Sequence, residues 1–440
     1  MGRHLPGPER ERHAMRQRRQ LHRSLTGVLS ALVCLGLTVT AQPAGAADTQ
    51  NSTRVASGET SASGEISWRA DLSRVDADDV NVRYGQGALT IRQRDFRSTA
   101  VGSEAGYGSQ VLAPRTLGRP VNRVRAELSA QVPSGARVAV DVRGRAEDGS
   151  WTEWREADTS PEASAVALPR TVVAVQARIT LWDKDGQARV RGLRLTADQG
   201  PEPRTPRAAA AFSARVFATR EGLVGGTTAN GHVIQPNDHF VALPSRRGLS
   251  PNGSGQYSVQ VCGPARCETA PVWDVGPWNI RDDYWNPSSV RESFKDLPQG
   301  KPEAQAAYEN GYNGGLDGSG RRVLNPAGID LADGTFANVG LRDNGWVTVT
   351  YLWTGPQTGK SFPTWGTAVR IRQQATTASP EVARLAGPTQ VNVSCQVHGQ
   401  RITVDGITND AWSYLPDYGG YITNIYIDVP EQWLPGVPQC

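Results

Sequence analysis

The sequence predicts an all-β protein of several domains, and three observations lead to this fold class. The chain contains 47 Gly and 29 Pro, which favour turns and therefore short strands over long helices. Apolar residues often alternate with polar ones, as at Val138, Val140 and Val142, which is typical of half-buried strands. One helix is expected, beginning at Pro302 and ending before Gly311.

The charge distribution argues against a nucleic-acid-binding protein. Residues 1–46 hold seven Arg and two Glu, so the 47 basic and 43 acidic residues of the chain leave 40 and 41 in the remainder. The body of the protein is therefore nearly neutral, whereas electrostatic binding of nucleic acid needs a basic face.

The N-terminus has the layout of a secretory signal peptide. Basic residues up to Arg23 precede an apolar run from Leu25 to Thr40, and Ala44-Gly45-Ala46 follows. We predict a signal peptide over 1–46 and a flexible Ser/Thr/Gly-rich lead-in over 47–64. Arg18-Arg19 leaves the twin-arginine route open beside the general one. The mature protein is expected to be secreted, extracellular or associated with the cell wall, and free of the membrane.

Four cysteines follow the predicted cleavage site, which suggests two disulfides in a secreted chain. Three pairings are possible. We predict Cys262–Cys267, across a tight turn, and Cys395–Cys440, which tethers the last residue to an upstream strand. A zinc site is not expected at the first pair, because no second ligand pair follows it.

Residues 65–197 are predicted to form an antiparallel β-sandwich, because period-two runs alternate with Gly, Asp and Ser turns. Trp151 and Trp154 fall on one strand face. They are candidates for stacking on sugar rings, with burial in the core as the alternative. A proline-rich linker is expected over 198–211.

The middle block, 212–355, contains four short motifs in a recognisable order. They are Gly225-Gly226-Thr227-Thr228-Ala229-Asn230-Gly231, Asp238-His239-Phe240-Val241-Ala242-Leu243-Pro244, Val272-Trp273-Asp274-Val275-Gly276-Pro277 and Gly328-Ile329-Asp330-Leu331-Ala332. This order resembles the double-psi β-barrel of the RlpA-like, expansin and barwin-like proteins. The resemblance implies a closed six-stranded barrel with an open groove for glycan.

The resemblance also implies roles for three residues of this block. Asp330 would be the general acid, Asp274 its partner or base, and His239 a residue that orients or tunes a carboxylate. The alternatives are Asp side chains that cap turns and a His with satisfied hydrogen bonds.

A long insert, 279–327, separates the two Asp motifs. Its aromatic residues, with those beside it, alternate with polar groups, as a platform for sugar rings would require. The candidate sugar contacts are Trp278, Tyr284, Trp285 and Tyr312, together with Asn230 of the first motif. The alternatives are that the aromatics anchor the insert to the barrel and that Asn230-Gly231 serves a turn.

Residues 367–440 resemble a bacterial SH3-like domain. The resemblance rests on Val369-Arg370-Ile371-Arg372, Leu385-Ala386-Gly387-Pro388, Trp412-Ser413-Tyr414-Leu415 and Gly420-Tyr421-Ile422. It implies a barrel that tethers the protein to peptidoglycan. Trp412 and Tyr421 are candidate contacts, with a core position as the alternative for Trp412.

These features predict a protein that binds and remodels cell-wall peptidoglycan or another polysaccharide, as a lytic transglycosylase or glycoside hydrolase. The alternatives are a non-catalytic, expansin-like binder and a barwin-like protease inhibitor. We expect no cofactor and no metal, because neither a phosphate-binding loop nor a zinc ligand set is present in the sequence. The sequence makes no prediction of the oligomeric state.

Overall fold

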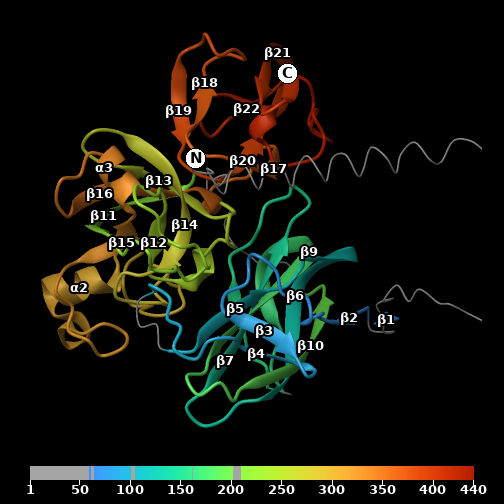
Figure 1. Ribbon diagram of the computed structural model, residues 1–440, viewed down its shortest axis with the longest axis vertical. Helices are drawn as coiled ribbons and strands as arrows, with labels where there is room; N and C mark the ends of the chain where they lie inside the picture. Colours follow the sequence, from blue (N-terminus) through green and yellow to red (C-terminus); the bar gives the residue numbers. More distant parts are fainter. Residues whose placement is uncertain (1–58, 61–63, 101–104, 161, 202–209) are drawn as a thin grey trace, which may run out of the picture. The chain divides into compact units, whose positions relative to one another are not determined.

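The computed structural model describes residues 59–60, 64–100, 105–160, 162–201 and 210–440 (Figure 1). The predicted signal peptide and most of the predicted lead-in and linker lie outside these ranges. Residues Glu59–Ile402 and Thr408–Cys440 form one compact unit, to which the hairpin tip Thr403–Ile407 does not belong. Among the described helices, none has the length and apolar character needed to cross a membrane.

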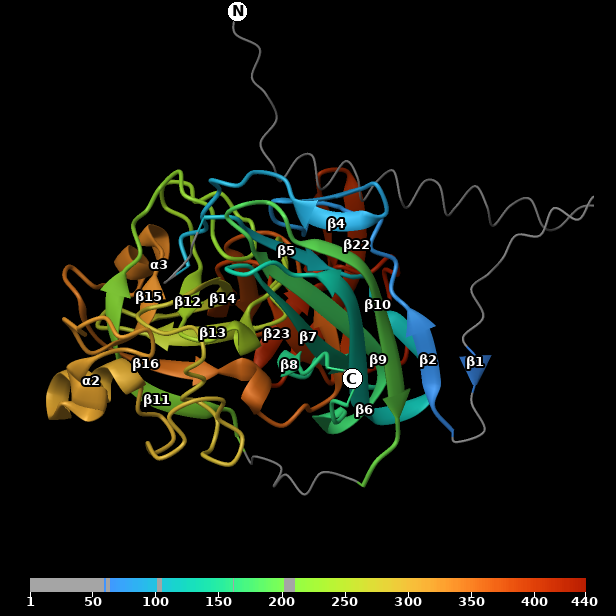
Figure 2. The same ribbon diagram turned by 90° about the horizontal axis from the view of Figure 1, so that it is seen from below.

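The first domain is built from antiparallel strands around one core. Its strands are β1 (Glu59–Thr60), β2 (Ile66–Arg69), β3 (Val82–Gly85), β4 (Ala88–Ile91), β5 (Tyr107–Val111), β6 (Arg115–Gln131), β7 (Arg137–Arg145), β8 (Arg155–Ala157), β9 (Val166–Trp182) and β10 (Arg189–Asp198). The main path of the sheet is β1-β2-β10-β6-β9-β7-β8, and β6, β9 and β10 are its long strands (Figures 1 and 2).

Strand β9 changes partner along its length. Its first part pairs with β6, where Val166 lies opposite Val124, and its last part pairs with β5, where Arg178 lies opposite Val111. Because the partners on one edge change, side chains from all parts of the sheet can enclose a single core, which includes Leu168. The predicted antiparallel β structure of this segment is confirmed.

Trp151 and Trp154 are both buried, and the sugar-stacking interpretation is therefore wrong for them. Trp154 is 1% exposed and Trp151 is 8% exposed. The guanidinium of Arg143 lies 4.1 Å from the ring centroid of each. Trp154 also donates through Nε1 to the carbonyl of Leu249, at 3.1 Å. The rings hold a buried cation and present no face to solvent.

The second domain is a closed six-stranded β-barrel. Its strands are β11 (Phe212–Arg220), β12 (Val241–Leu243), β13 (Ser258–Cys262), β14 (Cys267–Val275), β15 (Ala327–Leu331) and β16 (Gly345–Tyr351). They close in the order β11-β15-β12-β14-β13-β16 and back to β11. Two pairs, β11–β15 and β12–β14, are parallel, and the other pairs are antiparallel. The predicted closed barrel is confirmed.

The insert between β14 and β15 carries helix α2 (Glu303–Asn310) and the 3₁₀ turn η2 (Tyr312–Gly315). Helix α2 follows Pro302 and ends at Gly311, which has a φ of +66°. Glycine is favoured at this position because the backbone there is left-handed. The predicted helix, from Pro302 to before Gly311, is confirmed. A short helix, α3 (Asp333–Asn338), follows β15, and 3₁₀ turns occur at Arg246–Gly248 (η1) and Leu352–Thr354 (η3).

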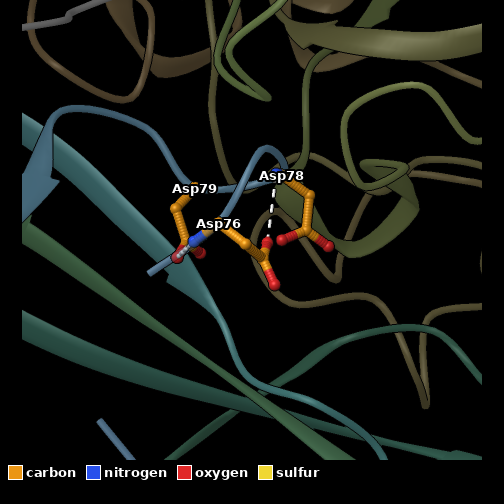
Figure 3. A group of neighbouring side chains, drawn as sticks. All are labelled: Asp76, Asp78 and Asp79. Carbon is orange, nitrogen blue, oxygen red and sulfur yellow. Dashed lines mark hydrogen bonds between the residues drawn. The ribbon is translucent and has the colours of Figure 1, made fainter. Parts of the chain in front are cut away.

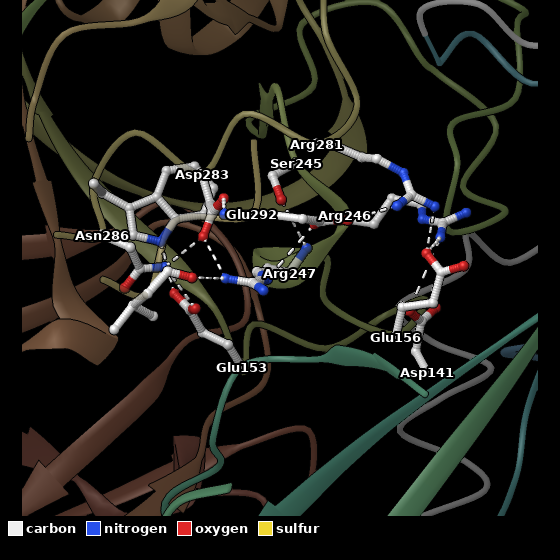
Figure 4. Close-up of polar contacts among 12 residues, drawn as sticks. Asp141, Glu153, Glu156, Ser245, Arg246, Arg247, Arg281, Asp283, Asn286 and Glu292 are labelled. Atoms are coloured by element: carbon white, nitrogen blue, oxygen red, sulfur yellow. Dashed lines mark hydrogen bonds and ion pairs between the residues drawn. The ribbon is translucent and has the colours of Figure 1, made fainter. Parts of the chain in front are cut away.

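A polar network joins the first domain to the barrel and its insert (Figure 4). Glu153 receives hydrogen bonds from the indole N–H groups of Trp285 (2.6 Å) and Trp353 (2.8 Å) and from the amide of Asn286 (2.8 Å). Beside it, Arg247 pairs with Asp283 at 2.6 Å. Charge-assisted bonds of this kind fix the orientation of the groups they join.

The C-terminal domain has its own small core. Its strands are β17 (Lys360–Pro363), β18 (Val369–Arg372), β19 (Glu381–Leu385), β20 (Gln390–Val393), β21 (Cys395–Val404), β22 (Ile407–Leu415) and β23 (Gly420–Thr423), with the 3₁₀ turn η4 (Asn424–Tyr426). Strand β19 also pairs with β14 of the barrel at one position, Thr269 opposite Leu385. Both predicted disulfides, Cys262–Cys267 and Cys395–Cys440, are confirmed.

We expect the two disulfides to contribute unequally to stability. Cys395–Cys440 closes a loop with a sequence separation of 45, and Cys262–Cys267 one of 5. The chain-entropy model gives about 4 kcal/mol for the longer loop and about 2 kcal/mol for the shorter. The difference is measured by urea unfolding of two variants, each with both cysteines of one disulfide changed to Ser. Hydrogen exchange then reports separately on the C-terminal domain and on the barrel. Equal losses in both variants would contradict it.

Candidate functional site

Four residues form a row across three strand pairs on the outer face of the barrel. Thr219 of β11 lies opposite Asp330 of β15, and Ala242 of β12 lies opposite both Asp330 and Asp274 of β14. Directly opposed residues point to the same side of a sheet. The neighbouring Leu331 belongs to the barrel core, so Asp330 points outward. An irregularity in β12–β14 between Val241 and Ala242 brings Asp274 to the same side.

Asp330 keeps part of its surface exposed. Its Oδ1 accepts a hydrogen bond from the hydroxyl of Thr219. Burial raises the pKa of Asp330 to about 7; the hydrogen bond from Thr219 opposes this shift, and the nearby charge of Asp274 adds to it. A carboxyl group with such a pKa holds a proton near neutral pH and can give it up, which is what a general acid requires.

Asp274 is 1% exposed, and hydrogen bonds hold both of its oxygens. Oδ1 accepts from the backbone N–H groups of Ala229 and Val275, each at 2.8 Å, and Oδ2 accepts from the hydroxyl of Thr99. Burial raises the pKa of Asp274 to about 6, although these hydrogen bonds lower it. The prediction that Asp274 acts as a base on substrate is wrong, because its oxygens are neither free nor accessible.

Glu221 is a member of this group that the sequence did not reveal. Burial, with the charges of Asp274 and Asp330, raises its pKa well above the usual range. Its side chain is hydrogen-bonded to Asp274, a contact that raises the pKa of Glu221 and lowers that of Asp274. The proton of this pair therefore resides on Glu221, which acts as a neutral donor to the Asp274 carboxylate.

The three carboxyl groups thus have different states. The hydrogen bond between Glu221 and Asp274 raises the pKa of Glu221 and lowers that of Asp274, whereas Asp330 is the partly exposed group. Like charges this close cannot all ionise together, and their titrations are coupled. The arrangement holds an exchangeable proton on Asp330 beside a fixed negative charge.

His239 does not contact these carboxylates. Its Nδ1 lies 2.8 Å from Oε1 of Glu268, whose carboxylate also accepts from the Thr335 hydroxyl (2.8 Å) and from the Asn338 amide. The hydrogen bond with Glu268 raises the pKa of His239. His239 therefore contacts a carboxylate, but this carboxylate is that of Glu268. The prediction that His239 belongs to the site of the two Asp residues is wrong.

Two of the aromatic residues proposed to bind sugar are buried. Tyr284 is 0% and Trp285 is 1% exposed. The ring of Trp285 stacks on Tyr351 with centroids 5.3 Å apart, and the hydroxyl of Tyr284 donates to the carbonyl of Gly328 at 2.9 Å. These side chains anchor the insert to the barrel core, so the sugar-platform prediction is wrong for them.

The other candidates of the barrel and insert differ in exposure. Trp278 and Tyr312 are half-buried; Trp278 donates through Nε1 to Asn325 (3.0 Å) and Tyr312 donates to Asp296 (2.8 Å). Asn230 is 5% exposed. Its amide donates to the carbonyl of Ser250 at 3.1 Å, and its oxygen accepts from Thr228 at 2.7 Å. Asn230 is therefore a turn residue, and its prediction as a sugar contact is wrong.

In the C-terminal domain, Trp412 is 2% exposed and donates through Nε1 to the carbonyl of Gln400 at 2.9 Å. It is a core residue, and its prediction as a ligand contact is wrong. Tyr421 is half-buried and packs against Tyr414, with ring centroids 5.1 Å apart. Part of the surface of both Tyr414 and Tyr421 is exposed to solvent.

A separate group of carboxylates, Asp76, Asp78 and Asp79, lies in the first domain (Figure 3). Backbone N–H groups donate to two of these carboxylates: that of Asp76 donates to Asp79 (3.0 Å), that of Asp78 to Asp76 (3.3 Å), and that of Val111 to Asp79 (2.7 Å). Burial, with neighbouring charges, raises the pKa of Asp78 to about 8. The hydrogen bonds are those of an Asx-type turn, and we assign the group this structural role.

The raised pKa of Asp330 predicts a pH-dependent cost of folding. A carboxyl group whose pKa is higher in the folded state binds more protons there, so its contribution to stability is present below about pH 4 and is lost as the pH rises through about 7. We expect Asp330→Asn to become more stable relative to the wild type across this window. Urea unfolding from pH 4 to 8 measures the difference.

Asp333→Asn is the matched control for this titration. The hydrogen bond from Arg220 lowers the pKa of Asp333, so its contribution is present above the unfolded pKa and is lost as the pH falls. Between pH 4 and 8, Asp333→Asn should therefore keep a nearly constant stability relative to the wild type, whereas Asp330→Asn should gain stability relative to the wild type. A flat difference between Asp330→Asn and wild type would contradict the raised pKa.

Comparison with known proteins gives limited similarity. Residues 212–350, which span the barrel, match a family described as a domain of unknown function, DUF8814. No curated protein matches this sequence. A solved structure described as truncated AlyQ with CBM32 and alginate lyase domains aligns at a TM-score of 0.16 and 11% identity, covering 65% of this chain and 97% of that one.

Proposed function

We propose that this protein acts on cell-wall glycan or a related polysaccharide, with Asp330 as its single general acid. The observation that carries the proposal is a partly exposed carboxyl group on the outer face of the barrel, which accepts a hydrogen bond from Thr219 and whose pKa burial raises to about 7. Burial is the main cause of the raised pKa of Asp330, and the nearby charge of Asp274 adds to it.

A single acid is sufficient for lytic cleavage. Asp330 would transfer its proton to the glycosidic oxygen as the bond to the leaving sugar breaks. The resulting carboxylate would then accept a proton from a hydroxyl of the same sugar, whose oxygen closes an anhydro ring. Hydrolysis with inversion is disfavoured, because it needs a second accessible carboxylate to activate water, and Asp274 has no accessible oxygen.

A second candidate function is glycan binding without cleavage. It is favoured by the burial of Asp274 and by the hydrogen bond from Thr99, a residue of the first domain, which covers that carboxylate. In this case Asp330 would serve as a hydrogen-bond donor to a sugar hydroxyl. Asp330 and its neighbours would then contribute to glycan affinity, and no glycosidic bond would be cleaved.

The setting of the reaction is part of the proposal. Two disulfides are consistent with an extracellular protein. Secretion by the predicted signal peptide and tethering to peptidoglycan through the C-terminal domain would place Asp330 beside its substrate. The half-buried Tyr414–Tyr421 pair supplies an aromatic surface for that contact.

Incubation of the mature protein with purified peptidoglycan and with cellulose tests the proposal. Mass spectrometry of the soluble fraction detects anhydro sugars, a reducing-end assay detects hydrolysis, and sedimentation of the insoluble polymer measures binding. Anhydro products support the single-acid mechanism. Sedimentation without products supports the binding function, and the absence of both contradicts the proposal.

A further inference from the structure

A cavity lies beside the single pairing between strands β14 and β19, and Asp330 is not among the residues that line it. It has a volume of about 590 Å³, within the range of about 300–1,000 Å³ typical of ligand pockets. His239, Arg266 and Glu268 line it from the barrel, and Glu381, Val382 and Arg384 line it from the C-terminal domain. The proposed glycan chemistry does not use these residues.

Two open strand edges border this cavity. Strands β14 and β19 are parallel and pair at Thr269 and Leu385, where the N–H of Ala386 also donates to the carbonyl of Thr269 at 2.9 Å. Before that point, Cys267 and Glu268 pair with β13 on one side. Glu381, Ala383 and Arg384 pair with β18 on one side, with an irregularity in the pairing at Val382. Within the described ranges, no strand pairs with the other side of either segment.

Unpaired strand edges present rows of backbone N–H and C=O groups that match an extended peptide. A peptide lying in the gap can pair with an edge on either side and continue the sheet from β14 to β19. A sugar chain lacks the regular alternation of donors and acceptors that these edges offer. The edges therefore favour a peptide over a glycan in this cavity.

The charges at the cavity favour an anionic group. Glu268 is held by His239, Thr335 and Asn338, and the hydrogen bond with Glu268 raises the pKa of His239. Glu381 is bound by Arg384 at 2.7 Å. Arg266 is exposed and forms no ion pair within the part of the chain that the structure describes. One cationic side chain is thus left to bind a ligand carboxylate.

We propose that this cavity binds an extended peptide with a free C-terminal carboxylate, which adds as a strand between β14 and β19 and places its carboxylate at Arg266. Main-chain hydrogen bonds to the two edges would provide affinity for any extended sequence. Arg266 would provide the preference for a free carboxylate end.

The test uses the mature protein and a fluorescent peptide of four alternating Thr and Val residues with a free C-terminus. Fluorescence polarisation should show binding that weakens about tenfold or more when the C-terminus is amidated, because a charge-assisted bond is lost. Methylation of the backbone nitrogens should abolish binding. A photoreactive version of the peptide should cross-link to segments 266–269 and 381–384.

Arg266→Ala should weaken binding of the free acid to the level of the amide, whereas Arg322→Ala, at another exposed arginine, should leave it unchanged. Equal affinity for acid and amide, or cross-links elsewhere, would overturn the proposal, as would no binding at about millimolar peptide. Asp330→Asn should not alter peptide binding. Failure here and failure of the glycan chemistry are therefore distinguishable.

Discussion

Asp330→Asn should reduce the release of soluble glycan products by about 100- to 10,000-fold, the usual contribution of a general acid. The amide has the size of the acid and can still bind the Thr219 hydroxyl, but it has no proton to transfer to a leaving oxygen. Binding to the polymer should stay nearly unchanged. Product release is measured by mass spectrometry and binding by sedimentation, with each variant at equal folded concentration.

Thr219→Val provides a test of the same mechanism that leaves the acid in place. The hydrogen bond from Thr219 lowers the pKa of Asp330, so its removal should raise that pKa. Because the protonated form is the active one, the loss of activity at high pH should move to higher pH. An unchanged pH profile, or undiminished product release by Asp330→Asn, would exclude Asp330 as the acid and leave the binding function.

The barrel was predictable because its motifs occur in a fixed order along the chain. Short segments such as Asp274-Val275-Gly276-Pro277 mark turns whose chemistry is local. The disulfides were also predictable, since four cysteines allow few pairings and Cys262 and Cys267 flank one turn. In each case, the information lies within a few residues or in a simple count.

Glu221 could not be found in this way. It follows Thr219 by two positions, and Thr219 lies opposite Asp330 only because β11 pairs with β15, more than 100 residues later. The pKa values of all three carboxyl groups arise mainly from burial, which depends on the closed barrel and not on any local pattern.

The aromatic residues of the insert show why the sugar-platform prediction failed. Aromatic rings interspersed with polar groups are typical of a sugar surface, but they are equally typical of a long loop with its own buried anchors. Trp285 stacks on Tyr351 and donates to Glu153, so its polar partners are inside the molecule. Composition alone does not separate these two arrangements.

The insert also contains a buried ion pair between Arg291 and Asp282. Arg291→Met should lower the free energy of unfolding of the insert by roughly 3–5 kcal/mol, the cost of leaving a buried charge without its partner. The side chains of Arg291 and Asp282 are 0% and 1% exposed. Arg291 donates through Nε to Asp282 Oδ1 at 3.0 Å, and the N–H of Glu303 donates to Oδ2 at 2.7 Å. Hydrogen exchange of the backbone over 282–303 measures this local stability.

The pH dependence and a double variant identify electrostatics as the cause. Burial raises the pKa of Asp282 to about 6, and Arg291 lowers it, so without Arg291 the carboxyl should take up a proton more readily. The cost of Arg291→Met should therefore shrink as the pH falls. Adding Asp282→Asn should recover part of the loss. Arg384→Met, at the exposed pair with Glu381, is the control and should cost about 1 kcal/mol or less. If the cost of Arg291→Met did not depend on pH, and if the costs of Arg291→Met and Asp282→Asn simply added in the double variant, lost packing and not charge would govern the stability of the insert.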